Sequence, residues 1–182
     1  MRIFYAVQFP DIIKQAMAEN LTEIKKHALR GNFTRRENFH LTLLFVGECE
    51  PRSLANFKTA ADSAIAKLKP APVKAVIDGL GTFPRPDGDI LWASMQTEPE
   101  NILGEVNNAL LAELRALNIN IRREHNRFVP HVTIGRKTEL RDKNLNDIKF
   151  APVSFEINSI AIMESVFTNG VTYEPLHESK FL

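Results

Sequence analysis

HLTL at residues 40–43 and HVTI at residues 131–134 share one pattern, and this pattern decides the expected fold. Each stretch reads histidine, aliphatic, threonine, aliphatic, and each lies in a hydrophobic run that predicts a β-strand. Side chains two residues apart on a strand point to the same face, about 6.6–7 Å apart, so each stretch presents an imidazole beside a hydroxyl. One such tetrapeptide is easily found by chance on an exposed strand. Two of them in one chain favour a shared function.

The composition is that of a soluble globular protein. The 182 residues are 44% hydrophobic and 25% charged, and the formal net charge is +1. A nucleic-acid partner must therefore meet a local patch and not a general positive field. Cys49 is the only cysteine, which excludes an intramolecular disulfide. No apolar run approaches the roughly 20 residues of a membrane span, and residues 1–7 enter a predicted strand directly. We expect a cytoplasmic monomer without a membrane partner.

Hydrophobic periodicity divides the chain into strands and helices. Strands are expected at 2–9, 39–46, 73–80, 90–96, 154–166 and 171–177, and helices at 10–30, 51–68, 99–117 and, in a shorter form, 140–148. Gly31 is expected to cap the first helix, and Gly47 to end the second strand. Residues 82–89 are expected to form a turn-rich loop, and Asn169-Gly170 to close the last hairpin. This order predicts an α+β fold with antiparallel hairpins, a single domain over residues 1–182 with two similar lobes.

The two histidines, His40 and His131, form a candidate acid–base pair. Histidine titrates near pH 6.5 when unperturbed, so one ring can accept a proton at neutral pH while another donates one. Hydrolysis or transesterification at phosphorus needs both steps. The hydroxyls of Thr42 and Thr133 can bind the non-bridging oxygens, whose charge must be stabilised in the transition state. This scheme requires no metal and no cofactor. The alternative, two surface histidines without a function, is favoured for one stretch alone but not for the pair.

Basic residues near the second stretch favour an anionic ligand. Arg136 ends the strand that carries His131, and Arg127 lies four residues before that histidine. A guanidinium group presents a planar fork of donors that suits phosphate oxygens. For the other basic residues between 122 and 137, a surface role without a ligand is at least as good an interpretation. Phe83 is a candidate platform for stacking a base at the edge of a cleft.

Other chemistries fit the sequence less well. The histidines do not have the spacing of a HExxH or similar metal motif, and a lone cysteine adds little to a metal site. A serine hydrolase would need a GxSxG turn, which does not occur. Cys49 has no histidine near it in sequence, so a small structural cysteine is the better interpretation. Trp92 lies within a predicted strand and is expected in the core.

The sequence resembles the two-histidine (2H) phosphoesterase superfamily and, within it, the RNA 2′,3′-cyclic 3′-phosphodiesterases, also called 2′-5′ RNA ligases. The resemblance rests on MRIFYAV at 1–7, NFHLTLLFVGE at 38–48, ILWA at 90–93 and RFVPHVTIGR at 127–136. It implies a bilobal α+β fold with pseudo-two-fold symmetry, in which two antiparallel sheets line a central cleft and helices lie outside. One HxTx strand in each lobe would place His40 and His131 opposite each other.

The resemblance also implies a reaction. Members hydrolyse RNA or nucleoside 2′,3′-cyclic phosphates to 2′-phosphates without metal, and some join RNA through 2′-5′ linkages. By that analogy His131 accepts a proton from water and His40 donates one to the 3′ leaving oxygen. Thr42 and Thr133 would hold the phosphate, and Arg136 would place positive charge beside it. The pseudo-symmetry lets the two histidines exchange roles when the reaction reverses.

Two other functions are kept as alternatives. One is a catalytically weak module that binds RNA ends or nucleotides, and the intact histidines and threonines argue against it. The other is a phosphodiesterase for 2′-5′ oligonucleotides or another cyclic phosphate. The sequence does not separate this from the first function, because substrate choice lies in loops such as 82–89 and 118–128.

Overall fold

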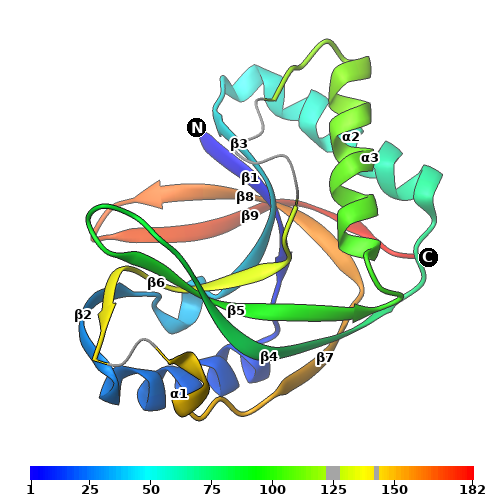
Figure 1. The fold of residues 1–182 in the computed structure, drawn as a ribbon. Helices are drawn as coiled ribbons and strands as arrows, with labels where there is room; N and C mark the ends of the chain where they lie inside the picture. The colour runs from blue at the N-terminus through cyan, green and yellow to red at the C-terminus, as the bar shows by residue number, and fades with distance from the viewer. Residues whose placement is uncertain (122–127, 142–143) are drawn as a thin grey trace.

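The computed structural model describes residues 1–121, 128–141 and 144–182 (Figure 1). Its strands are β1 (Arg2–Gln8), β2 (Ala28–Phe33), β3 (His40–Glu48), β4 (Val73–Phe83), β5 (Asp89–Glu98), β6 (His131–Leu140), β7 (Val153–Ile157), β8 (Ser159–Phe167) and β9 (Val171–Lys180). Its α-helices are α1 (Asp11–Lys26), α2 (Leu54–Leu68) and α3 (Ile102–Ala116). Short 3₁₀ turns occur at Arg36–Asn38, Pro51–Ser53 and Leu145–Asp147.

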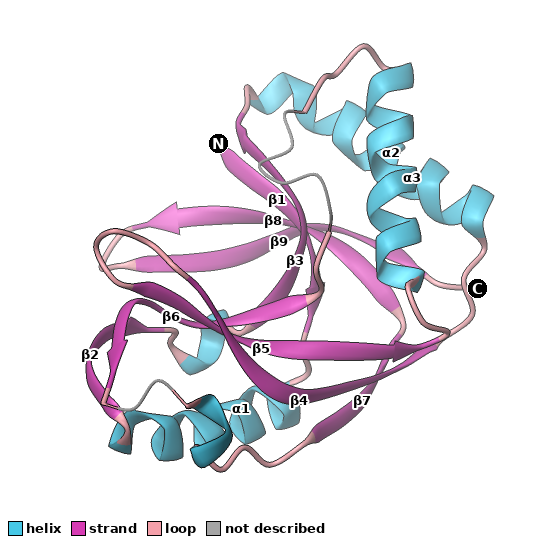
Figure 2. Cartoon of the chain, in the orientation of Figure 1, coloured by secondary structure: helices cyan, strands magenta, loops and turns pink. Residues whose placement is uncertain are grey.

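The strands form an antiparallel sheet in two halves that meet at one point. The order along the sheet is β7-β4-β5-β6-β3-β1-β8-β9, and β2, which is off this path, pairs with β6. Within the described strands, the ladder between β3 and β6 consists of a single residue pair, Leu41 with Val132. The halves β7-β4-β5-β6 and β3-β1-β8-β9 therefore diverge from this pair. The α+β class is confirmed, with a strongly curled antiparallel sheet and the helices outside it (Figure 2).

One face of the sheet packs against the helices and forms the core. The inward residues of the central strands, such as Leu41, Leu91 and Val132, are fully buried there. The helices contribute apolar stripes at spacings of three and four residues, as in an amphipathic helix. These stripes are Ile13, Met17, Leu21 and Ile24 on α1; Phe57, Ala61, Ala64 and Ile65 on α2; and Val106, Leu110 and Leu114 on α3. The opposite face of the sheet is left to carry polar side chains.

The first helix is shorter than predicted. It ends at Lys26, and residues 28–33 continue as β2, which pairs with β6. Gly31 therefore lies within a strand and is not a helix cap. The predicted short helix at 140–148 is also wrong in its described part, because β6 extends to Leu140 and only Leu145–Asp147 form a 3₁₀ turn.

Three strand predictions also need correction. The predicted strand 154–166 is two strands, which separate at Asn158 and belong to opposite halves of the sheet (Figure 1). β7 pairs with β4, whereas β8 pairs with β1. The strand around residues 39–46 continues past Gly47 to Glu48. The β4–β5 hairpin is longer than expected, so Phe83 belongs to β4 and not to a loop.

Buried polar contacts attach the sheet to its helices. Asn107 on α3 donates through Nδ2 to the carbonyl oxygen of Leu43, 2.7 Å away, which fixes β3 in the middle of its length. The Tyr5 hydroxyl donates to the carbonyl oxygen of Phe57 at 2.9 Å and ties β1 to α2. Burial raises the pKa of this phenol well above its usual value, so it stays a donor. These hydrogen bonds pair polar groups whose burial without a partner would lower the stability of the fold.

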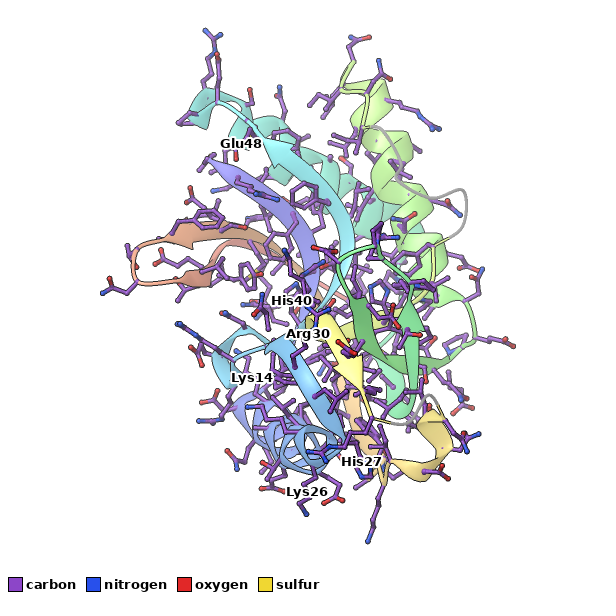
Figure 3. The ribbon with its side chains drawn as sticks, turned by 60° about the vertical axis from the view of Figure 1, so that its left-hand side comes forward. Lys14, Lys26, His27, Arg30, His40 and Glu48 are labelled. Atoms are coloured by element: carbon purple, nitrogen blue, oxygen red, sulfur yellow. The ribbon has the colours of Figure 1, made fainter. Side chains whose placement is uncertain are left out.

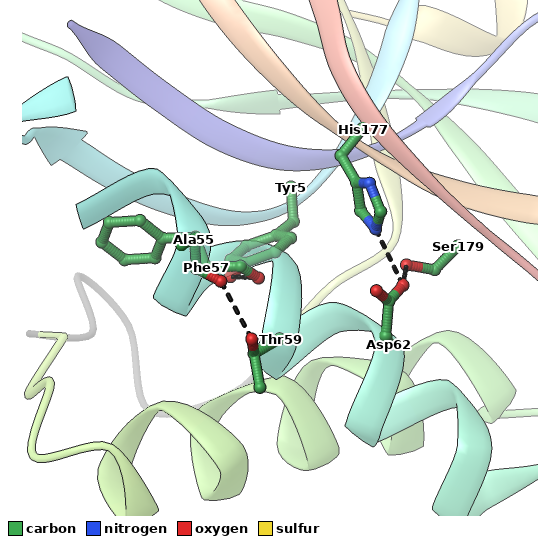
Figure 4. A network of polar contacts seen from close by, with 7 residues as sticks. All are labelled: Tyr5, Ala55, Phe57, Thr59, Asp62, His177 and Ser179. Atoms are coloured by element: carbon green, nitrogen blue, oxygen red, sulfur yellow. Dashed lines mark hydrogen bonds and ion pairs between the residues drawn. The ribbon is translucent and has the colours of Figure 1, made fainter. Parts of the chain in front are cut away.

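The outer strand β9 has its own attachment to α2. Asp62 accepts hydrogen bonds from His177 Nε2 at 2.8 Å and from Ser179 Oγ at 2.6 Å (Figure 4). Both donors reach the same carboxylate, so the three residues form a clamp between strand and helix. None of the helices in the described part of the chain has the length and apolar character of a membrane span.

Candidate active site

The junction of the two halves brings the two HxTx stretches together. Leu41 of β3 pairs with Val132 of β6, and both side chains point into the core. Because side chains alternate along a strand, the flanking histidines and threonines point to the other face. The antiparallel register places His40 level with Thr133, and likewise Thr42 level with His131. Diagonal neighbours in such an arrangement lie about 7–8 Å apart, which leaves room for one phosphate group between the two rings.

Both histidines are held in the same orientation by the backbone. Nδ1 of His40 lies 2.7 Å from the carbonyl oxygen of Asn38, and Nδ1 of His131 lies 2.7 Å from that of Val129. A carbonyl oxygen only accepts, so Nδ1 carries the proton and donates in both rings. In the neutral form, Nε2 then carries the lone pair. Each imidazole is thus prepared to exchange a proton through Nε2.

The ring of His40 is enclosed by aromatic side chains. Its centroid lies 5.0 Å from that of Phe4 and 4.9 Å from that of Tyr173, which meets it edge-on. Phe4 and Tyr173 belong to a small apolar cluster on the polar face of β1 and β8, apart from the main core. The Thr42 hydroxyl lies 3.0 Å from Nε2 and donates to it when the ring is neutral. A substrate must displace the Thr42 hydroxyl from Nε2 before His40 can exchange a proton with that substrate.

This enclosure gives His40 an unusual proton affinity. Burial lowers the pKa of His40 from its ordinary value to about 4, and the bond to the Asn38 carbonyl opposes this only in part. The positive charges of Lys14 and Arg136, and the ring of His131, lower the pKa further. These three influences indicate that Lys14, Arg136 and His131 all lie near the ring, since electrostatic effects fall off with distance.

The ring of His131 lies against a different group of aromatic side chains. Its centroid is 5.2 Å from that of Phe83, which meets it edge-on, and 6.1 Å from that of Trp92. Phe83 and Trp92 pack on each other at 5.1 Å, with an angle of 30° between the rings. The indole lies directly over Gly81, where an added Cβ would collide with the six-membered ring. Only glycine at this position leaves room for the indole.

A change of register places Arg136 on the same face as the site. Leu91 pairs with Gly135, whereas the next residue of β5 pairs with Thr133, so β6 has one extra residue here. Consequently Ile134 and Gly135 are both buried, and Arg136 is exposed. Such a bulge re-aims the side chains that follow it. The guanidinium is thereby turned outward on the face that carries Thr133.

The structure therefore assembles most of the predicted site residues at one point of the sheet. His40, Thr42, His131, Thr133 and Arg136 share a face, and Phe83 borders His131. Arg127, the other candidate for substrate contact, lies outside the described residues.

Several residues around the histidines were not found by sequence reasoning. Trp92 was expected in the core but is half-buried and lies beside His131. Lys14, Asn38 and Tyr173 surround His40 from α1, a 3₁₀ turn and β9, elements that are far apart in sequence. No local pattern marks these three residues, because their role arises only from the sheet order. Among the described residues, no group of three or more His, Cys, Asp or Glu side chains is arranged to hold a metal ion.

Comparison with known proteins identifies this arrangement as a phosphoesterase fold. The chain belongs to the 2′-5′ RNA ligase superfamily, whose sequence profile matches residues 12–166. Proteins named RNA 2′,3′-cyclic phosphodiesterase are similar over nearly the whole chain. That of Methanocaldococcus jannaschii is 28% identical, over 98% of this chain and 99% of its own length. That of Aquifex aeolicus is 31% identical, over 89% and 88%. The predicted family and enzyme class are confirmed.

Solved structures agree on the fold. E. coli LigT in complex with 3′-AMP aligns with a TM-score of 0.76 at 21% identity, covering 99% of this chain and 97% of LigT. A protein from Thermus thermophilus aligns with a TM-score of 0.72 at 23% identity, covering 100% and 98%. At these identities the likeness concerns the fold, and it agrees with the predicted 2H phosphoesterase architecture.

Proposed function

We propose that this protein is a metal-independent cyclic phosphodiesterase that hydrolyses the 2′,3′-cyclic phosphate of an RNA end or nucleoside to a 2′-phosphate. The observation that carries the proposal is the register at Leu41 and Val132, which sets two imidazoles and two threonine hydroxyls around one small area of the sheet. The reaction at phosphorus requires one proton acceptor, one proton donor and stabilisation of the phosphoryl oxygens. The names of the sequence relatives support the same substrate class.

The proposed roles follow the in-line geometry of displacement at phosphorus. His131 Nε2 accepts a proton from water as the water oxygen bonds to phosphorus. The bond from phosphorus to the 3′ oxygen breaks, and His40 Nε2 gives its proton to that oxygen. Thr42 and Thr133 donate to the non-bridging oxygens, and Arg136 balances their charge. The product keeps its phosphate on the 2′ oxygen.

The low pKa of His40 is compatible with its role as a donor once the substrate is bound. In the free protein, burial keeps the ring neutral above a pH of about 4. A cyclic phosphate carries a negative charge, and an opposite charge beside an imidazole raises its pKa. Binding of the substrate therefore promotes protonation of His40, and loss of the charged product reverses it.

The test is hydrolysis of a nucleoside 2′,3′-cyclic phosphate in excess chelator. The wild-type protein should release the 2′-phosphate, and His40→Ala and His131→Ala should each lower kcat by about 10²–10⁴-fold. His27→Ala is the matched control, because His27 lies at the end of α1 beside Glu23, away from the junction (Figure 3). Activity that disappears with chelator, or that survives both substitutions at the junction, contradicts the proposal. Tight binding without any turnover would instead support the alternative of a binding module.

The same residues can also join RNA ends. If a 5′ hydroxyl replaces water, His131 takes its proton, the 3′ oxygen leaves with the proton of His40, and a 2′-5′ linkage forms. The aromatic pair beside His131 supports this second activity, since Phe83 and Trp92 would lie near the incoming nucleoside. Incubation of RNA fragments with cyclic phosphate and 5′ hydroxyl ends should give a joined product that depends on both histidines.

A further inference from the structure

A pocket on the His40 side of the junction is separate from the pair of threonines. It is partly open to solvent and is lined by His40, Lys14, Asn38 and Tyr173 together with Gln8 and Glu37. Its walls come from β1, α1, the 3₁₀ turn before β3, and β9. The aromatic pair on the His131 side does not contribute to it. The two histidines thus have different neighbouring spaces.

Asn38 gives an independent sign that the pocket is built for a ligand. Its side chain is only 6% exposed, and Nδ2 donates to the carbonyl oxygen of Val171 at 2.8 Å. That bond fixes the orientation of the amide, so the group left over is the acceptor Oδ1. Among the described residues, nothing donates to this buried oxygen. A buried acceptor without a donor is costly, and a ligand that supplies an N–H or O–H group relieves this cost.

Lys14 adds a cation to the same pocket. It lies in the first part of α1, it is half-buried, and it forms no ion pair with any described residue. By contrast, Lys26 near the end of the same helix (Figure 3) pairs with Glu23 at 2.5 Å. The ammonium group of Lys14 is close enough to His40 to affect the charge of that ring. A partly desolvated, unpaired ammonium group favours an anionic group of a ligand.

We propose that this pocket is the subsite for the nucleoside that carries the cyclic phosphate, and that Lys14 binds the phosphate on its 5′ oxygen. This inference rests on the proposed function, in which His40 protonates the 3′ oxygen, so that the ribose must lie on the His40 side. A nucleoside supplies a donor for Asn38 Oδ1 through its base or its sugar. The 5′ phosphate lies one sugar away from the reacting phosphorus. The preferred substrate is then a nucleotide that continues in the 5′ direction, as at an RNA 3′ end.

The experiment compares two substrates that differ only in the anion. Adenosine 2′,3′-cyclic phosphate and its 5′-phosphorylated form are hydrolysed by the wild-type protein, Lys14→Met and Lys26→Met. We expect the 5′ phosphate to raise kcat/KM roughly tenfold or more in the wild-type protein, the size of one charge-assisted hydrogen bond. Lys14→Met should remove this advantage, and Lys26→Met should keep it. Higher salt should weaken the advantage in the wild-type protein.

The possible outcomes separate the two proposals. If neither substrate is hydrolysed, the proposed function fails. If both are hydrolysed at equal rates by the wild-type protein, only the subsite fails. If Lys14→Met lowers kcat/KM equally for both substrates, Lys14 acts on the reacting phosphate, and the assignment to the 5′ phosphate is overturned. Thermal unfolding of each variant, measured by circular dichroism, shows whether a loss comes from the fold instead.

Discussion

The two halves of the site carry the same motif in unlike surroundings. Both histidines donate from Nδ1 to the carbonyl oxygen two residues before them, at the same distance. His40, however, is enclosed by Phe4 and Tyr173 and has a pKa of about 4, whereas His131 borders a pair of large aromatic rings, Phe83 and Trp92. The motif therefore sets the geometry of the proton transfer, and the neighbouring strands make the two positions chemically different.

The largest expected effect tests directly whether the two histidines have different roles, His40 as proton donor and His131 as proton acceptor. A substrate with sulfur in place of the 3′ bridging oxygen has a leaving group that needs no proton. On this substrate His40→Ala should regain most of the 10²–10⁴-fold that it loses on the natural cyclic phosphate. His131→Ala should not recover, because water still needs a base. Steady-state kinetics on both substrates measures this, and recovery in His131→Ala alone would reverse the assigned roles.

The next effect concerns the arginine on the His131 half. Arg136→Met should lower kcat/KM by about 10–100-fold, the cost of losing a charged hydrogen bond to the phosphate. Lys137→Met is the matched control, since it removes the same charge one residue further on, from a side chain that pairs with Asp87 at 2.9 Å. Kinetics at low and high salt should separate a direct contact from a general field. Equal losses in both variants would argue against a specific contact by Arg136.

A smaller effect is expected from substitution of Gly81, which leaves room for the Trp92 ring of the aromatic pair. A methyl group at Gly81 would collide with Trp92 Cζ2, so Gly81→Ala must move the indole away from its place beside His131. We expect a stability loss of about 1–3 kcal/mol, as for other overpacked sites, and lower kcat. Gly104→Ala makes the same change on α3, against the end of the Asn101 side chain. Thermal melts and kinetics of both variants should show a kinetic effect for Gly81 alone.

The smallest effect is a shift in the pH dependence. Activity needs one protonated and one neutral histidine. As the pH falls through about 4, His40 takes up a proton, the pair becomes doubly protonated, and kcat/KM declines. The acidic limb should therefore lie near pH 4, below the 6.5 of an unperturbed histidine. Lys14→Met removes a positive charge beside His40 and should move the limb to higher pH, whereas Lys26→Met should leave it in place.

The sequence was sufficient for the family, the class of fold and the pair of histidines. The HxTx pattern carries this information locally, since its alternation alone defines which residues share a face. The strand boundaries depended on partners that lie elsewhere in the chain. Residues 28–33 follow a helical stripe and include a glycine, and they become a strand because β6 offers them a partner. Residues 154–166 alternate like one strand, yet Asn158 separates two strands with different neighbours.

The residues that surround the histidines could not be predicted from local sequence patterns either, because they also come from distant parts of the chain. Lys14, Asn38 and Tyr173 come from three elements that meet only when β1, β3, β8 and β9 are assembled. The outward direction of Arg136 depends on a bulge that shows in the register but not in the letters of the sequence. Sequence reasoning chose Arg136 because it ends the strand of His131, and the bulge supplies the physical reason for its direction.

The single ladder pair between β3 and β6 also makes catalysis a measure of complete folding. Leu41 and Val132 are far apart in the chain, and a contact of such high contact order forms slowly. Neither half holds an acid and a base by itself, so a partly folded chain has no working site even if one half is already native. In a refolding experiment, the return of hydrolysis should accordingly report the docking of the two halves, while helical signals recover earlier.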